Sequence, residues 1–284
     1  MNEQLVIHPR TKLAIDQYIL APSHSLMLVG SKGAGKLTTA RFLIKKIIGS
    51  LDNNPYYLEL SPDKNIISIE SIRQLQSFVR LKTTGLAQWR RAILIQDAHF
   101  LTIEAQNAFL KLLEEPPNDT IIILTVVNQT NLLPTILSRA PVIDIKAASK
   151  AQAIEHFSKY NEATVIRAFL ISCGQIGLMT KLLDKNQNQD MLRCIDLAKQ
   201  FLQMPAFDRL VFIDHYLKQK DSIEDLLWAL LLVSKAALNQ AGQHAKQTLV
   251  KRWKTRITAV LNAQDALPSH PLPKLLLTDL SLQI

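Results

Sequence analysis

The chain has 284 residues, enough for two or three domains with buried cores, and only two cysteines, Cys173 and Cys194, with no CxxC pair and no disulfide framework. A net charge of +9 and a pI near 9.5 favour an acidic partner such as nucleic acid, although solubility alone would also account for this charge. With no charged-then-apolar leader and no apolar run near the roughly 20 residues of a membrane span, we expect a cytoplasmic protein without a membrane partner.

The first hundred residues predict alternating helices and short strands. A helix is expected over 8–21, a buried strand over 26–29, and a second helix that Gly49 ends. A strand over 56–60 and an amphipathic helix over 69–81 follow, and a polar loop covers 82–88.

The central stretch predicts two neighbouring strands of a parallel sheet. Residues 92–95 and 121–127 are almost wholly apolar and rich in Ile and Val, which is typical of strands buried on both faces. Between them Thr102 is expected to cap a helix that Pro116 and Pro117 end. Polar residues follow both strands, and ligands of open α/β sheets bind at these carboxyl ends, so we expect a site, or its remains, here.

After Ile145 the pattern is helical to the end of the sequence. Short helices are expected over 148–185, a polar linker over 186–190, then longer helices that include 223–237, capped by Ser222, and 244–263. Pro268 to Pro273 interrupt the pattern before a last helix over 274–280. The predicted division is an α/β domain over 1–147, a small helical domain over 148–187 and an all-α domain over 188–284.

A phosphate-binding loop is predicted between the first strand and the following helix. Gly30 to Lys36 match GxxxxGK, in which backbone N–H groups surround phosphate and the lysine reaches the terminal phosphates. The hydroxyl residue that should bind Mg²⁺ is replaced by Leu37, and Thr38 lies about 100° further round the helix. A glycine turn kept only for its shape is the alternative interpretation. The candidate nucleotide-binding residues are Gly30, Ser31, Lys32, Gly33, Ala34, Gly35, Lys36, Leu37 and Thr38.

The residues that follow the strand over 92–95 also depart from the pattern of an active nucleotide site. A working P-loop ATPase has an Asp that holds Mg²⁺ and a Glu that activates water, whereas this chain has Gln96 and Asp97. An amide has no charge to hold the cation. We therefore expect weak ATP binding at most, no bound Mg²⁺ and no hydrolysis by this chain.

The chain resembles the bacterial clamp-loader AAA+ family over roughly residues 8–145, most clearly in the segments that follow the strand over 92–95. The similar segments are Asp97-Ala98-His99-Phe100-Leu101-Thr102, Ala105-Gln106-Asn107-Ala108-Phe109-Leu110-Lys111, Leu113-Glu114-Glu115-Pro116-Pro117 and Leu132-Leu133-Pro134-Thr135-Ile136-Leu137-Ser138-Arg139. The resemblance implies an AAA+ P-loop domain with a parallel sheet, then a helical lid and an all-α collar. It also implies that the protein helps to load a sliding clamp onto primed DNA during replication.

Within that family, the chain is similar to subunits whose nucleotide motifs are eroded. The gamma/tau subunits keep GK[ST], an acidic Walker B pair and a four-cysteine zinc module, which is missing here, so no zinc is expected. Gly177 stands where the sensor-2 helix of an active subunit would have Arg. Asn128 aligns near the sensor-1 position. His8 and Pro9 resemble residues of the adenine pocket, but a helix entry is the better explanation of this pair.

Arg139 is the residue to which the resemblance gives a catalytic role. In the family, a Ser-Arg-Cys motif supplies an arginine finger to the nucleotide of the neighbouring subunit, and Ser138-Arg139-Ala140 keeps the arginine. The implied partners are the gamma/tau and delta subunits, the sliding clamp and primer–template DNA. A surface arginine after a helix is the alternative for Arg139. Glu114 and Glu115 are interpreted as a helix end rather than as an acid/base pair, because adjacent helix residues point apart.

Two groups of basic residues are candidates for contact with the DNA backbone. Arg73, Lys82, Arg90 and Arg91 lie in the region where clamp loaders follow the duplex. Lys246, Lys251, Arg252, Lys254 and Arg256 lie on one late helix whose apolar face is expected at Leu249, Trp253, Ile257 and Val260, so this charge also fits a solvated face.

Three functions remain open from the sequence. The chain is a non-catalytic clamp-loader subunit that presents Arg139, a divergent AAA+ ATPase that uses Thr38 and Asp97 in displaced roles, or a helper ATPase of another replication or repair complex. Leu37, Gln96 and Gly177 favour the first.

Overall fold

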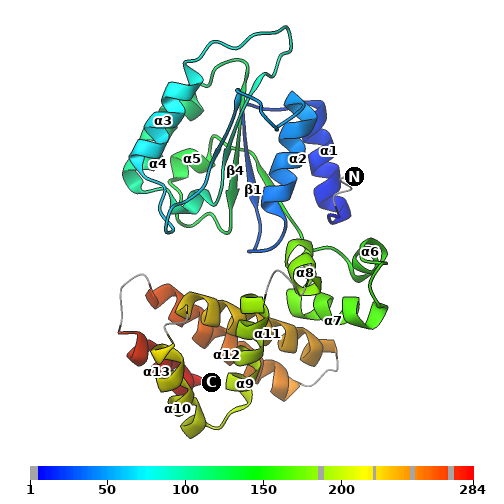
Figure 1. The fold of residues 1–284 in the computed structure, drawn as a ribbon, viewed down its shortest axis with the longest axis vertical. Helices are drawn as coiled ribbons and strands as arrows, with labels where there is room; N and C mark the ends of the chain where they lie inside the picture. The colour runs from blue at the N-terminus through cyan, green and yellow to red at the C-terminus, as the bar shows by residue number, and fades with distance from the viewer. Residues whose placement is uncertain (1–5, 185–188, 220–221, 244–246, 268–271) are drawn as a thin grey trace. The chain divides into compact units, whose positions relative to one another are not determined.

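A computed structural model describes residues 6–184, 189–219, 222–243, 247–267 and 272–284 (Figure 1). The chain divides by its internal packing into two compact units. The first comprises Met1–Gln152 and Gln175–Leu178, and the second Ala153–Gly174 and Met179–Ile284. The expected division into three domains stays a prediction.

The first unit contains a five-stranded parallel sheet with the strand order β2-β3-β4-β1-β5. The expected strands over 26–29, 56–60, 92–95 and 121–127 are confirmed to within a residue or two at each end. The strands are β1 (Ser25–Val29), β2 (Tyr57–Leu60), β3 (Arg91–Ile95), β4 (Thr120–Val126) and β5 (Val142–Asp144).

The central strands are buried on both faces because alternate side chains enter two different cores. Ile93, Ile122 and Leu124 pack with α3, α4 and α5 on one face, whereas Leu94, Ile121 and Ile123 pack with α1 and α2 on the other. Figure 1 shows these two layers of helices around the sheet. The helices are α1 (Pro9–Leu20), α2 (Lys36–Ile48), α3 (Ile69–Val79), a 3-10 turn η1 (Ala98–Phe100), α4 (Ile103–Glu114) and α5 (Pro134–Leu137).

The helix starts follow local capping chemistry. Thr102 Oγ1 accepts a hydrogen bond from the N–H of Ala105 at 3.2 Å, as expected. His8 Nδ1 accepts from the N–H of Arg10 at 3.2 Å and Pro9 occupies the first helical position, which supports the helix-entry interpretation of this pair.

Strand β5 was not predicted. Val142 and Asp144 are exposed and only Ile143 is buried, so the strand has no hydrophobic pattern of its own. It forms because it pairs with β1, with Met27 opposite Val142. Pairing with β1 thus stabilises a strand that the sequence of these three residues does not indicate.

The second unit is helical throughout its described residues. Its helices, two of which begin or end in the first unit, are α6 (Lys150–His156), α7 (Glu162–Ser172), α8 (Ile176–Leu183), α9 (Gln189–Gln203), α10 (Ala206–Lys218), α11 (Ile223–Gln243), α12 (Gln247–Ala266) and α13 (Pro273–Gln283). Ser222 Oγ caps α11 by accepting from the N–H of Asp225 at 3.2 Å. Helix α11 extends six residues beyond the expected end at Ala237.

Some expected features fall wholly or partly outside the described residues. These are the start of the linker over 186–190, the first residues of the helix over 244–263 and most of the break over 268–273. Gln189 and Asp190 belong to α9 rather than to a linker.

The buried face of α12 differs from the expected one. Arg256, Ala259, Val260 and Ala263 are buried, whereas Leu249 is 36% exposed. Arg256 lies over the Trp253 ring at 4.7 Å and donates a hydrogen bond to the carbonyl of Ile284 at 3.3 Å. Burial, with repulsion from Arg252 and Arg209, lowers the pKa of Arg256 to about 10. This arginine is therefore part of the core and not of a solvated basic face.

None of the helices in the described ranges is long and apolar enough to cross a bilayer.

Candidate functional site

The predicted phosphate loop lies at the carboxyl end of β1 and leads directly into α2. Gly33 and Gly35 have φ of 87° and 89°, a left-handed backbone that glycine adopts without a side-chain penalty. The N–H of Gly30 donates to the carbonyl of Val126 at 3.1 Å, which fixes the loop to the end of β4. The backbone thus has the glycine-dependent curvature of a loop that can surround an anion.

Lys36 is held inside this loop. Its side chain is 7% exposed, and Nζ donates to the carbonyls of Gly30 at 2.8 Å and Ser31 at 3.1 Å. Burial lowers the pKa of Lys36, and the nearby negative charge of Asp97 opposes that effect. The lysine is therefore placed where its ammonium group can meet a phosphate.

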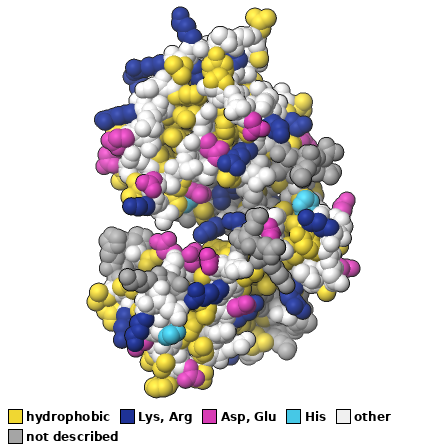
Figure 2. All heavy atoms as spheres, in the orientation of Figure 1, with side chains coloured by type: hydrophobic (Ala, Val, Ile, Leu, Met, Phe, Trp, Pro, Cys, Tyr) yellow, Lys and Arg dark blue, Asp and Glu magenta, His cyan; other side chains and the backbone are white. Residues whose placement is uncertain are grey.

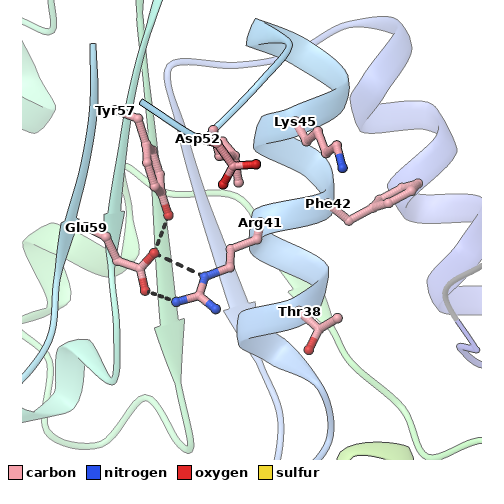
Figure 3. Close-up of a pocket in the computed structure, with 8 residues that line it drawn as sticks. Thr38, Arg41, Phe42, Lys45, Asp52, Tyr57 and Glu59 are labelled. Atoms are coloured by element: carbon pink, nitrogen blue, oxygen red, sulfur yellow. Dashed lines mark hydrogen bonds and ion pairs between the residues drawn. The ribbon is translucent and has the colours of Figure 1, made fainter. Parts of the chain in front are cut away.

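The hydroxyl chemistry expected of a Mg²⁺ site is not assembled beside Lys36. Leu37 is half-buried and packs with the core around α1 and α2. Thr38 is exposed and lines a different cavity of about 470 Å³ with Arg41 and Lys45, which lie on the same side of α2 (Figure 3). Thr38 is thus not in position to replace the missing hydroxyl.

Gln96, the first residue of the predicted Walker B pair, binds a carboxylate on a neighbouring strand. The side-chain amide of Gln96 donates a hydrogen bond to Glu59 on β2, and Glu59 binds Arg41 at 2.6 Å (Figure 3). Burial raises the pKa of Glu59, but hydrogen bonds from Arg41 and Tyr57 outweigh this and bring it below its usual value. Gln96 is therefore bound to an ionised carboxylate.

Asp97, the next residue, has φ of 45°, and its N–H donates to Thr125 Oγ1 at 2.9 Å.

The segment from Gln175 to Leu178 lies directly on the phosphate loop. Leu178 N–H donates to the carbonyl of Gly33 at 3.2 Å, and Gln175 Nε2 donates to Ser31 Oγ at 2.8 Å. A Cβ atom at Gly177 would lie 2.9 Å from the carbonyl oxygen of Gly33. The backbone of the phosphate loop thus occupies the space that a side chain at residue 177 would need.

We expect Gly177→Ala to loosen this contact. In α8, alanine would ordinarily stabilise the helix, but here its methyl group meets fixed backbone, and overpacking of this kind costs about 1–3 kcal/mol. Hydrogen–deuterium exchange should be faster at the Leu178 amide. Gly242→Ala, in open space on α11, is the matched control and should leave this exchange unchanged. Equal protection of Leu178 in both variants would contradict the expectation.

Asn128 follows β4 at the same edge of the sheet. It is exposed, and its Oδ1 accepts a hydrogen bond from Thr130 Oγ1 at 2.9 Å. Its side chain is therefore engaged within its own loop, and its assignment to sensor 1 stays a prediction.

Ser138 and Arg139 lie at the other end of the strands, beside the amino end of β1. They follow α5 and precede β5, and Ser25 at the start of β1 donates through Oγ to the carbonyl of Arg139 at 2.5 Å. The strand between Ser25 and Val29 is roughly 13 Å long, at about 3.3 Å per residue. Arg139 and the phosphate loop of the same chain are therefore separated by the length of the sheet.

Sequence reasoning missed the partner of Arg139. Its Nη2 binds Glu114 Oε1 at 2.7 Å, and Nη1 donates to the carbonyl of Thr135 at 3.0 Å and to Ser138 Oγ at 3.3 Å. Glu114 is the last residue of α4, as expected of a helix end. Because the two residues are far apart in sequence, no local pattern indicates the pair.

The basic residues proposed for the DNA backbone are not equally available. Arg91 is 2% exposed and donates to the carbonyls of Val79 and Leu81, so its place among surface candidates is wrong. Arg90 donates to Gly85 at 2.6 Å, whereas Arg73 is 67% exposed. On the face drawn in Figure 2, Lys and Arg side chains are scattered among acidic and uncharged ones.

Among the described residues there is no group of three or more His, Cys, Asp or Glu side chains that would hold a metal ion. The altered residues at the phosphate loop do not fit Mg²⁺ either, since Leu37 offers no oxygen and Gln96 is bound to Glu59.

The comparisons with known proteins agree with this architecture. Residues 50–149 match the family described as DNA polymerase III, delta subunit. The chain is 31% identical over 138 residues to DNA polymerase III subunit delta' of Bacillus subtilis, covering 43% of this chain and 41% of the relative. It is also 24% identical over 200 residues to subunit tau of the same organism, covering 63% of this chain and 34% of that relative.

The matched segments thus span well under half of the length of these relatives. Among solved structures, a gamma subunit-related DNA polymerase III protein of Thermotoga maritima aligns with a TM-score of 0.53 and 17% identity over 96% of this chain and 97% of that one. The expected α/β fold with a parallel sheet is confirmed, as is the resemblance to subunits of the clamp-loader family.

Proposed function

We propose that this chain is a delta-prime-like subunit of the DNA polymerase III clamp loader, which hydrolyses no ATP itself and donates Arg139 to the ATP site of a neighbouring subunit. The similarity to delta' subunits and the AAA+ fold support the first part. The geometry of the two candidate sites supports the second.

The observation on which the proposal depends is the separation of Arg139 from its own phosphate loop. The loop lies at the carboxyl ends of the strands, and Arg139 lies beside the amino end of β1. An arginine finger must reach the phosphoryl group directly to stabilise its charge. Arg139 can therefore act only on a nucleotide that another subunit holds.

The chain's own loop fits a phosphate group but not a catalytic metal site. Lys36 and the backbone N–H groups of the loop would hold the phosphates of ATP, which would stay bound without being hydrolysed. Leu37 has no oxygen for Mg²⁺ and Gln96 has no negative charge to hold it, while Gln175 and Leu178 donate hydrogen bonds to Ser31 and Gly33. ATP binding, if present, would then be weak and without turnover.

The partners of the proposal follow from the assembly. The gamma/tau subunits would provide the neighbouring ATP site, with delta completing the loader and the sliding clamp as its cargo. Primer–template DNA would be contacted through its phosphates, for which exposed residues such as Arg73 are candidates and buried Arg91 is not.

The second candidate function is a divergent AAA+ ATPase of the gamma/tau type. The intact curvature of the loop and the buried position of Lys36 favour it. The position of Thr38 in another cavity and the pairing of Gln96 with Glu59 argue against it.

Lys36→Ala separates these two functions. We expect ATP turnover by purified gamma, delta and this protein, with clamp and primed DNA, to stay within about twofold of wild type, because no turnover depends on this loop. The variant should also leave clamp loading unchanged. A strong loss of turnover would make this chain an ATPase in its own right and would overturn the proposal.

A further inference from the structure

We propose that Glu114 is a latch that holds the guanidinium of Arg139 on its own chain until the phosphate of a neighbouring subunit displaces it. The inference rests on the proposed function, because it assigns a regulatory partner to the same finger. Glu114 is a positioning residue and touches no substrate.

Both terminal nitrogens of Arg139 are engaged within this chain. Nη2 binds Glu114 at 2.7 Å, while Nη1 donates to Thr135 and Ser138. A phosphate that takes the N–H groups bound to these acceptors must replace them. The guanidinium is thus held by acceptors of its own chain.

The two sides of the latch are attached to fixed backbone. Helix α4, which ends at Glu114, is anchored by the buried side chains of Ala105, Phe109 and Leu112. The backbone of Arg139 is held by Ser25, which donates to its carbonyl, and its neighbour Pro141 accepts from the N–H of Met27 at 2.8 Å. Release of the finger therefore needs only side-chain rotation.

The place of Glu114 in its helix supports a specific role for the pair. A negative charge at the carboxyl end of a helix is disfavoured by the helix dipole, and Arg139 compensates that charge. The arginine in turn would otherwise present an unpaired cation. Each residue thus stabilises the other in the free subunit.

The latch is weak enough to open. The side chains of Arg139 and Glu114 are 35% and 49% exposed, and ion pairs between exposed side chains add little stability because water screens them. The phosphates of a bound nucleotide have more negative charge than one carboxylate. A neighbour's nucleotide would therefore displace Glu114 from Arg139.

Glu114→Gln tests the inference in the reconstituted assembly. Glutamine keeps the shape but loses the charge that attracts Arg139, so we expect kcat/KM for ATP at the neighbouring site to rise about two- to fivefold, the range of a weak surface pair. A purely structural role would not raise turnover. Glu115→Gln, one residue away and exposed, is the matched control and should leave kcat/KM unchanged.

The same measurement in the Arg139→Ala background shows whether Glu114 acts through Arg139. There, Glu114→Gln should have no further effect. Unchanged or lower kcat/KM in Glu114→Gln alone, or a rise that persists without Arg139, would overturn the latch while leaving the finger intact. If Arg139→Ala itself leaves turnover unchanged, the proposed function fails and the latch fails with it.

Discussion

Arg139→Ala is expected to lower ATP turnover at the neighbouring site by a factor on the order of 10³, the lower end of the range for arginine fingers in GTPases. The guanidinium stabilises charge that develops on the transferring phosphoryl group, and water that enters in its place is less well oriented for that task. The chain's fold should not change, because the Arg139 side chain is 35% exposed and its pair with Glu114 is a surface one.

The measurement needs an assembly in which only the site facing Arg139 is active. The other gamma subunits would have a substituted phosphate-loop lysine, and single-turnover hydrolysis would be followed with clamp and primed DNA. Arg139→Lys should recover only part of the rate, since an ammonium keeps the charge but loses the planar fork. Arg80→Ala, at an exposed arginine, should behave as wild type. A loss of less than twofold in Arg139→Ala would refute the finger.

The second large effect is expected on stability, from Asp119→Ala. Arg91 is 2% exposed, with Nη1 3.8 Å from Asp119 Oδ1, and Asp119 also accepts hydrogen bonds from Thr83 and Thr120. Removing one partner of a buried pair leaves the other charge uncompensated, at a cost of about 3–5 kcal/mol. Because the pair is long and Arg91 keeps its bonds to two carbonyls, we expect about 3 kcal/mol.

Urea unfolding would measure the change in free energy of unfolding. Asp16→Ala, at an exposed position of α1, is the control and should change stability by no more than about 0.5 kcal/mol. A loss for Asp119→Ala as small as that of the control would mean that Arg91 is satisfied by backbone carbonyls alone.

Asp119 also predicts how stability depends on pH. Burial raises its pKa, but hydrogen bonds from Thr83 and Thr120, with the charge of Arg91, bring the pKa below its ordinary value. A group whose pKa is lowered on folding adds stability above its unfolded pKa, near 4, and this contribution disappears as the pH falls through the folded pKa. Below that pH, wild type and Asp119→Ala should approach each other in stability.

The sequence by itself determined the features that local chemistry controls. The strand, glycine loop and helix around Lys36 depend on hydrophobic periodicity and on glycine conformations within a few residues, and the cap at Thr102 depends on one side chain and one nearby N–H. The missing hydroxyl at Leu37 and the missing negative charge at Gln96 were likewise visible from residue type alone. Four of the five strands were predictable for the same reason.

Only the tertiary structure decided which distant residues meet. Strand β5 exists because β1 pairs with it, Arg91 and Arg256 are buried because surrounding elements cover them, and Glu114 reaches Arg139 because α4 and α5 pack together. Charged residues in a sequence are ordinarily assigned to the surface, and the cost of burying them is offset only by partners that the fold brings near. Local periodicity does not indicate those partners, so the ion pair of Arg139 with Glu114 and the separation of Arg139 from the phosphate loop could be found only in three dimensions.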